Sequence, residues 1–126
     1  MTDLKRYILI FLTGAIGYCI IEILWRGFTH PSMAVVGGIC LLLIRYINRR
    51  FSDRPYAFRA MLCSFGISLI ELASGILLNM VLHLNVWDYS AQPLNLMGQI
   101  CPLYSFLWFF LSLAVIYFGN KIPAFR

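Results

Sequence analysis

The sequence predicts an all-α membrane protein with four transmembrane helices, organised as one domain over residues 1–126. Of the 126 residues, 61% are hydrophobic and 12% are charged. A soluble domain usually contains about 25% charged residues. A chain this short also has too much surface for its volume to hide such an apolar excess in a core. Lipid is therefore the expected solvent, and the bilayer is the expected partner.

Four apolar stretches are the candidates for the spans: Tyr7–Trp25, Met33–Ile47, Ala60–Leu84 and Ile100–Phe118. A spanning helix needs about 20 mostly apolar residues. The first, third and fourth stretches meet this requirement, whereas the second is short and contains Arg45. We expect the Arg45 side chain to extend along its helix to the cytoplasmic surface, which would lower the cost of placing its charge in a span.

The lysines and arginines indicate the orientation. If all four stretches span, Arg26 stands alone on one side of the bilayer. The other nine of the 10 basic residues fall on the opposite side: Lys5, Arg6, Arg45, Arg49, Arg50, Arg54, Arg59, Lys121 and Arg126. Because cytoplasmic loops contain the excess of Lys and Arg, we expect both termini in the cytoplasm and a single topology. Since these charges report topology, we expect no nucleic-acid partner.

A short similarity suggests an internal repeat. Residues Gly17–Glu22 read GYCIIE and residues Gly66–Glu71 read GISLIE, each with a glutamate five residues after a glycine. Both lie on helices that we expect to run outward. Such a repeat would produce two parallel helix hairpins, an arrangement known from transporters.

Two carboxylates lie inside the predicted spans. We place Glu71 near the middle of the third helix and Glu22 nearer the outer end of the first. A carboxylate in hydrocarbon is costly, so it normally faces a bundle interior or a water-filled cavity and marks a functional site. The alternative is a structural polar link between helices. Glu22 and Arg26 are four residues apart on one helix face, and a pair that neutralises itself suits either role.

Polar and small residues follow one face of the third stretch, in steps of three or four residues. Such a stripe faces other helices or a pathway, and not lipid. Close packing alone would explain its serines and glycine, but not its glutamate, asparagine and histidine. The stripe consists of Ser64, Ser68, Glu71, Gly75, Asn79 and His83.

The loop before the fourth span supplies the remaining candidates. Trp87 and Tyr89 suit the outer interface, where aromatic belts lie. Asp88, Asn95 and Gln99 are polar and come without a basic residue. The loop is either an ordinary extracytoplasmic turn or a mouth that offers Asp88 to a solute, and its composition leaves both interpretations open.

Several kinds of site are not indicated. The sequence contains no phosphate-binding GxxxxGK[ST] loop and no CxxC or Cys/His metal spacing. We interpret the widely spaced cysteines as small interior residues. We therefore expect no metal, no cofactor and no enzymatic activity. The cysteines are Cys19, Cys40, Cys63 and Cys101.

The third loop resembles a known membrane family, described as Putative ABC-transporter type IV and also called CmpB-like. The resemblance covers nearly the whole chain. Its most specific part combines WDYS at Trp87–Ser90, PLNLMGQIC at Pro93–Cys101, and Trp108. The other matching elements are Gly17–Phe28, Gly37–Gly38, Glu71–Gly75 and Asn79.

The resemblance implies a multi-pass permease of bacterial plasma membranes, with a separate ATPase subunit as a candidate partner. In this chain, the cytoplasmic segment available to such an ATPase is Asn48–Phe58. The family positions found here are Glu22, Arg26, Gly27, Glu71, Trp87, Asp88, Tyr89, Ser90, Asn95, Gly98, Gln99 and Cys101.

Three functional hypotheses follow. The first is a small permease or channel-like protein that moves a small cationic solute or a proton through a homo-oligomer, with a dimer as the expected form. The second is a membrane scaffold, a regulatory subunit or a lipid-acting protein. The third is a proton-coupled exporter of the small multidrug type. For the first, the expected binding residues are Glu71, Glu22, Asp88, Asn79, Asn95, Gln99, Arg26, Trp87 and Tyr89.

Overall fold

A computed structural model describes residues 2–126, and over this range the chain is helical without strands. Four helical segments in the described range are long and apolar enough to cross a membrane, as predicted. Their large apolar side chains are mostly exposed, which a bilayer would accommodate. The elements are α1 (Asp3–Arg26), α2 (Pro31–Arg50), α3 (Tyr56–Gly75), the π-helical η1 (Ile76–Val81) and α4 (Pro102–Gly119).

Local sequence signals mark several helix ends. The Thr2 hydroxyl accepts a hydrogen bond from the Lys5 amide at 3.3 Å and begins α1. Gly27 ends α1 in the left-handed conformation, at φ 83°, which glycine adopts without a steric penalty. Pro31 and Pro102 occupy the first turns of α2 and α4, where the missing N–H costs nothing.

The second span is longer than the apolar stretch suggested. Helix α2 has 20 residues, enough to cross the bilayer. The prediction that Arg45 extends to the surface is wrong: the side chain is buried, its residue is 5% exposed, and its Nε donates to the Phe125 carbonyl at 3.0 Å. The Arg45 guanidinium also lies over the Tyr7 ring, 5.4 Å from its centroid. The chain after α4 folds back and brings this carbonyl acceptor to Arg45.

The polar stripe holds over most of its length. The Ser64 hydroxyl donates to the Ser105 carbonyl at 2.5 Å, and the Ser68 and Ser105 hydroxyls are 2.7 Å apart. These bonds join α3 to α4, as expected for polar residues between membrane helices. The prediction fails at His83, which has left the helix with φ 56°. In η1 the Leu82 amide donates to the Leu77 carbonyl, five residues back, so the α-helical spacing no longer applies.

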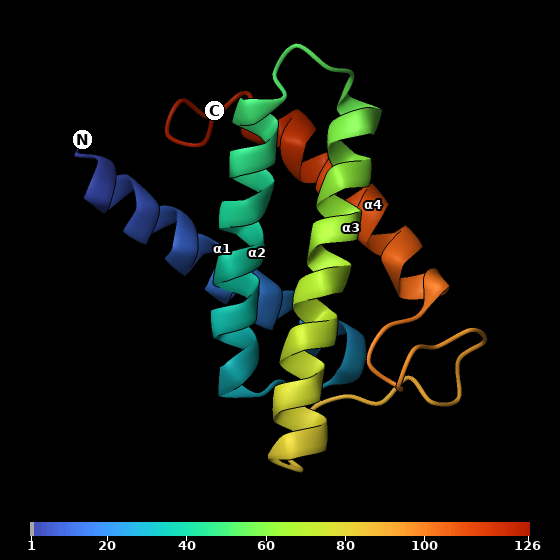
Figure 1. Cartoon of the computed structure of the whole chain (residues 1–126). Coiled ribbons are helices and arrows are strands. Elements are labelled where there is room, and N and C mark those ends of the chain that lie inside the picture. Colours follow the sequence, from blue (N-terminus) through green and yellow to red (C-terminus); the bar gives the residue numbers. More distant parts are fainter. Residues whose placement is uncertain (1) are drawn as a thin grey trace.

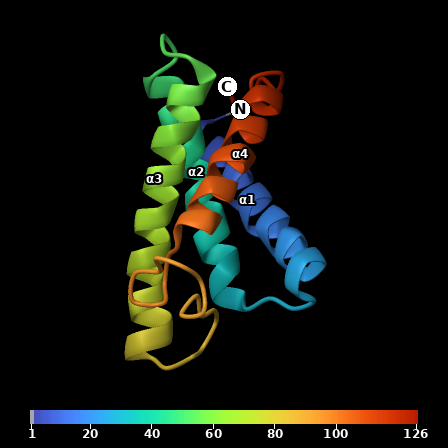
Figure 2. The ribbon, with the colours of Figure 1, turned by 90° about the vertical axis from the view of Figure 1, so that its right-hand side faces the viewer.

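Helices α2 and α3 lie side by side, and α1 and α4 both pack behind them (Figures 1 and 2). Helix α1 pairs with α2, and α3 pairs with α4. Helices α1 and α3 run in the same direction in Figure 1, so the two hairpins are parallel. Among the described elements, the backbone of α1 closely approaches that of α2 alone. Helices α1 and α4 therefore both pack against the layer of α2 and α3, but their backbones do not closely approach each other.

Glycines allow the close crossing of α1 and α2. A Cβ atom on Gly14 would lie 2.6 Å from the Gly37 carbonyl oxygen and 3.2 Å from the Gly38 Cα. Both distances are shorter than van der Waals contact, so the two backbones meet directly. Gly17, three residues further along α1, has nothing within 4 Å of such a Cβ. Tight packing at Gly14 thus changes to open space at Gly17.

Both termini and the α2–α3 loop lie at one end of the molecule, called here the terminal end (Figure 1). Arg59 anchors this loop: its Nε donates to the Phe51 and Arg54 carbonyls at 2.9 and 3.0 Å. Its Nη1 donates to Asn48 Oδ1 at 2.9 Å and its Nη2 to the Ser52 carbonyl at 2.5 Å. The opposite end, called here the loop end, contains residues 27–30 and 82–101.

Candidate functional site

A pocket of about 280 Å³ opens between α1, α3, α4 and the loop after η1. Five of the residues singled out from the sequence contribute to its lining: Glu71, Glu22, Arg26, Trp87 and Tyr89. They come from positions up to 67 residues apart in the chain (22 to 89). The fold therefore brings both intramembrane carboxylates to one place.

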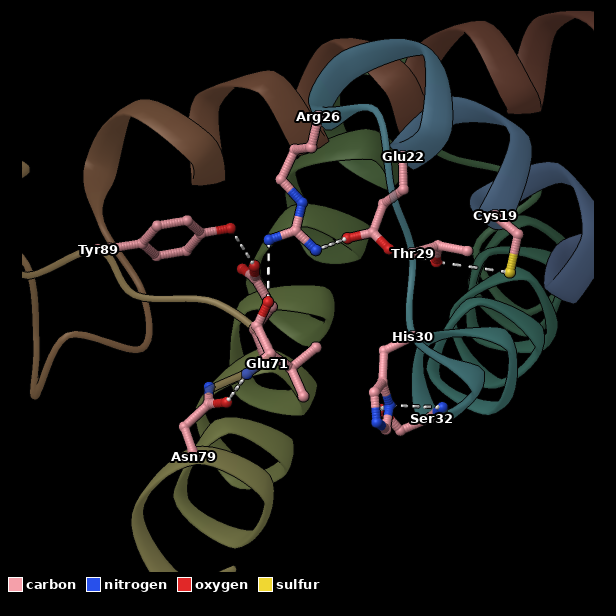
Figure 3. A network of polar contacts seen from close by, with 10 residues as sticks. Cys19, Glu22, Arg26, Thr29, His30, Ser32, Glu71, Asn79 and Tyr89 are labelled. Carbon is pink, nitrogen blue, oxygen red and sulfur yellow. Dashed lines mark hydrogen bonds and ion pairs between the residues drawn. The ribbon is translucent and has the colours of Figure 1, made fainter. Parts of the chain in front are cut away.

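Glu71 is the buried acid of the pocket, and its residue is 4% exposed. The Tyr89 hydroxyl donates to Glu71 Oε2 at 3.0 Å, and the Trp108 indole N–H donates to Oε1 at 2.9 Å. Figure 3 shows the Tyr89 hydroxyl directed at this carboxylate. Both donors are neutral, and within residues 2–126 Glu71 has no ion-pair partner. A negative charge here is hydrogen-bonded but not neutralised.

Glu22 is held differently, by a cation. Arg26 Nη2 donates to Glu22 Oε2 and Thr29 Oγ1 donates to Oε1, each at 2.6 Å (Figure 3). Arg26 Nη1 donates to the Val86 carbonyl at 2.9 Å, which ties the end of α1 to the loop after η1. The Arg26 guanidinium also lies over the Phe28 ring, 4.6 Å from its centroid. Glu22 is therefore part of a neutral ion pair that joins helix and loop.

The charges of the pocket do not cancel. Two glutamates, Glu22 and Glu71, and one arginine, Arg26, contribute to the lining. With both carboxylates ionised, the formal charge is −2 + 1 = −1. The unbalanced charge belongs to Glu71, since Arg26 is already bonded to Glu22. With Glu71 ionised, the pocket thus offers one negative charge to a ligand.

Aromatic side chains form much of the remaining wall. Tyr18 stacks on Trp108 with ring centroids 5.7 Å apart, and Tyr89 stacks on Tyr104 at 4.6 Å with nearly parallel rings. These two stacks hold the rings that donate to Glu71. Burial is the main cause that raises the pKa of the Tyr89 phenol, and nearby Glu71 raises it further, so Tyr89 remains a donor at neutral pH. Aromatic faces beside a carboxylate suit an organic cation.

Asn79 and Gln99 lie outside this pocket and bond to each other. Asn79 Nδ2 donates to Gln99 Oε1 at 2.8 Å, and the Val86 amide donates to Asn79 Oδ1 at 2.7 Å. The Trp87 indole N–H donates to the Gln99 carbonyl at 3.0 Å. A Cβ atom on Gly75 would overlap the Gln99 side chain. These groups attach the loop to η1 and place Trp87 at the pocket.

Asp88 and Asn95 organise the loop itself, away from the pocket lining. Asp88 is exposed and accepts a hydrogen bond from the Ser90 amide at 2.9 Å. This bond lowers the pKa of the Asp88 carboxyl below its usual range. Asn95 Oδ1 accepts from the Gly98 amide at 3.0 Å, and its Nδ2 donates to the Ser90 and Gln92 carbonyls. The structure therefore separates these two residues from Glu71 and Glu22.

Sequence reasoning overlooked two contributors to the site. Thr29 lies beyond the end of α1, so helical periodicity does not place its side chain, although its hydroxyl bonds the Glu22 carboxylate. Trp108 entered only through the family resemblance, and nothing local indicates that its indole reaches Glu71. Tyr18 lies four residues before Glu22, on the same helix face, and also lines the pocket. Among residues 2–126, no group of three His, Cys, Asp or Glu side chains could hold a metal ion.

Comparison with known proteins identifies a family and leaves the solute open. The family model described as Putative ABC-transporter type IV matches residues 7–124. No curated protein and no solved structure matches the chain. The matched range includes most of α1, all of α2, α3 and α4, and every residue of the pocket.

Proposed function

This chain belongs to the family described as Putative ABC-transporter type IV, and from that premise we propose that it is a small permease whose solute is an organic cation bound at Glu71. The observation that supports this proposal is the buried Glu71 carboxylate, which within residues 2–126 is bonded by the neutral donors of Tyr89 and Trp108. A buried charge without a counter-charge is costly. A cationic solute would supply that counter-charge.

The walls favour an organic cation over a bare proton or a metal ion. A cation over an aromatic face gains about 0.5–2 kcal/mol from the ring electrons. Tyr18, Tyr104 and Trp108 offer such faces beside Glu71. A proton would need no aromatic wall, and a metal ion would seek several oxygen ligands. We propose binding and movement without a chemical step.

A second copy of the chain is part of this proposal. The pocket lies toward the loop end, between α1 and α4, and one copy offers no polar path from it to the terminal end. We propose that a homo-oligomer, a dimer in its simplest form, completes the path. Both termini would lie in the cytoplasm of a bacterial plasma membrane, with the α2–α3 loop available to an ATPase subunit.

A scaffold is the second candidate, and one observation favours it. The Asn79–Gln99 and Glu22–Arg26 pairs satisfy each other within the chain, as structural links would. On that reading Glu71 also serves packing, through its bonds to Tyr89. Cation binding that depends on Glu71 distinguishes the two functions, because a scaffold has no need of it.

The test is cation-dependent stability of the protein in lipid nanodiscs. Tetramethylammonium should raise the unfolding temperature of the wild type, since a ligand at 100 times its dissociation constant stabilises by about 2.7 kcal/mol. Glu71→Gln should remove this response. Asp88→Asn is the matched control, because it neutralises an exposed carboxylate outside the pocket. An equal response in wild type and Glu71→Gln would refute the proposal.

A further inference from the structure

A second cavity continues from the pocket toward the terminal end. It has a volume of about 450 Å³ and lies between α1 and α4. Tyr18, Ile21, Trp108 and Leu111 line both cavities, so the two spaces adjoin. Apart from these shared residues, its walls are almost entirely aliphatic or aromatic. We call this second cavity the apolar cleft.

The apolar cleft exists because the backbones of α1 and α4 stay apart. Gly14 brings α1 onto the Gly37–Gly38 segment of α2, while the backbones of α1 and α4 do not meet. Figure 2 shows these two helices crossing at a wide angle. Gly17 lines the cleft and has nothing within 4 Å of the position of a Cβ atom. The cleft is therefore open at this point of α1 because Gly17 has no side chain.

We propose that the pocket and the apolar cleft together bind a cationic amphiphile, with its amine or quaternary ammonium head at Glu71 and its single aliphatic tail in the cleft. This inference rests on the proposed cation site and names its substrate class. An apolar cleft within a bilayer is favourably filled by hydrocarbon, whereas water would find no polar partners there. The adjoining polar pocket gives such a chain a place for its head.

The dimensions suit one tail. From Trp108 to Phe118, α4 lines the cleft over ten residue steps, which is about 15 Å at a rise of 1.5 Å per residue. The hydrocarbon core of a bilayer is about 30 Å thick, so this length corresponds to one leaflet. A head at the pocket and a tail directed toward the terminal end would lie roughly along the helices.

Charge complementarity selects the head. The excess negative charge of the pocket comes from Glu71, whose partners in the described part of the chain are the neutral donors of Tyr89 and Trp108. Arg26 has both Nη groups engaged, by Glu22 and by the Val86 carbonyl. Arg26 Nε has no hydrogen-bond partner, but the charge of Arg26 is already balanced by Glu22. A phosphate would therefore find no net positive charge in the pocket, and Glu71 would repel it. A head with net positive charge fits, and an anionic phospholipid head does not.

The experiment separates the head from the tail, using the full chain in nanodiscs. The probe is dodecyltrimethylammonium with a photoreactive diazirine in its tail, and the labelled positions are read by mass spectrometry. Tetramethylammonium reports the head site alone. Gly17→Phe places a phenyl ring in the open space of the cleft beside Gly17. Ile16→Phe is the matched control, because Ile16 is on the same helix and is 61% exposed.

If the amphiphile binds in the cleft, the labelling of the cleft walls on α1 and α4 should saturate as its concentration rises. Gly17→Phe should reduce that labelling about tenfold, the effect of overfilling a packed space, while leaving tetramethylammonium binding intact. Ile16→Phe should leave both unchanged. Glu71→Gln should abolish both.

Three outcomes would overturn the inference. Labelling that never saturates and spreads over the exposed faces of the helices would make the tail contact ordinary lipid contact. If tetramethylammonium still bound through Glu71 in that case, the cation site would stand without a tail site. Absence of binding by either probe would remove both proposals. A change in oligomer mass on Gly17→Phe, without cleft labelling in the wild type, would show that a second copy fills the cleft.

Discussion

Two glycines on one face of α1 should respond oppositely to the same substitution. Gly14→Ala places a Cβ atom 2.6 Å from the Gly37 carbonyl oxygen and 2.6 Å from the Leu41 Cβ. Gly17→Ala places one in open space. Both changes replace glycine by a better helix former in the same helix, so the difference between them isolates the helix crossing.

The magnitudes follow from two opposing effects. Alanine in place of glycine within a helix gains about 0.5–1 kcal/mol. Overpacking costs about 1–3 kcal/mol, and Gly14 should be at the upper end because backbone atoms of α2 cannot move independently of their helix. We expect Gly14→Ala to lower the free energy of unfolding by about 1–2 kcal/mol. Gly17→Ala should raise it by about 0.5–1 kcal/mol.

The assay is reversible unfolding in mixed detergent micelles, in which the loss of helix is measured by circular dichroism. The double variant should give about the sum of the two single effects, because a Cβ atom on Gly17 would have nothing within 4 Å through which it could couple to Gly14. Equal changes for the two single variants would refute the reasoning, because they would mean that α1 does not cross α2 at Gly14.

Three further predictions concern the loops and the pocket. Arg59→Lys should cost about 2–4 kcal/mol of unfolding free energy, because an ammonium cannot reproduce the planar fork that anchors the α2–α3 loop. Trp108→Phe should lower the free energy of unfolding by about 1–3 kcal/mol, since Glu71 would lose its indole donor. The Asp88 carboxyl should titrate below 3.8, its ordinary value. The stability that this carboxylate gives to the loop is thus present above pH 3.8 and is lost as the pH falls through the lowered pKa.

Each of these predictions has a control. Arg50→Lys, at an exposed position, should change the free energy of unfolding by less than about 0.5 kcal/mol. A loss of stability equal to that of Arg59→Lys would contradict the anchoring role of Arg59. Trp25→Phe changes another tryptophan of the pocket and should be milder than Trp108→Phe. The Asp88 titration is followed by the carboxyl carbon signal in NMR. Ser90→Pro removes the amide donor and should return the titration to about 3.8; an unchanged titration would argue against the bond.

The spans were predictable because hydropathy is a local property of the chain. Each of the four apolar stretches corresponds to one spanning segment, and the bounds differ by a few residues at polar ends. The spacing of the polar stripe was also sound as far as α3 remained an α-helix. It failed at His83 because the π-helical η1 ends at Val81 and His83 is outside the helix, with φ 56°; no residue type announces that end.

The candidate site was predictable only in part. Glu71 and Glu22 stood out because ionisable groups are rare in hydrocarbon, and the fold places both at one pocket. Asp88 and Asn95 looked equally polar in the sequence, yet they bond within the exposed loop. Composition cannot distinguish a polar group that organises a turn from one that faces a ligand.

The sequence by itself determined the solvent of this protein, the number of its spans and the rarity of its intramembrane charges. These follow from the transfer cost of each side chain, which is a property of the residue and its near neighbours. Only the tertiary structure decided which donors reach Glu71. Tyr89 and Trp108 are 18 and 37 residues away along the chain, and their positions depend on how α4 and the loop pack against α3. Helix packing, a sum of many small contacts across the fold, also opened the apolar cleft between α1 and α4.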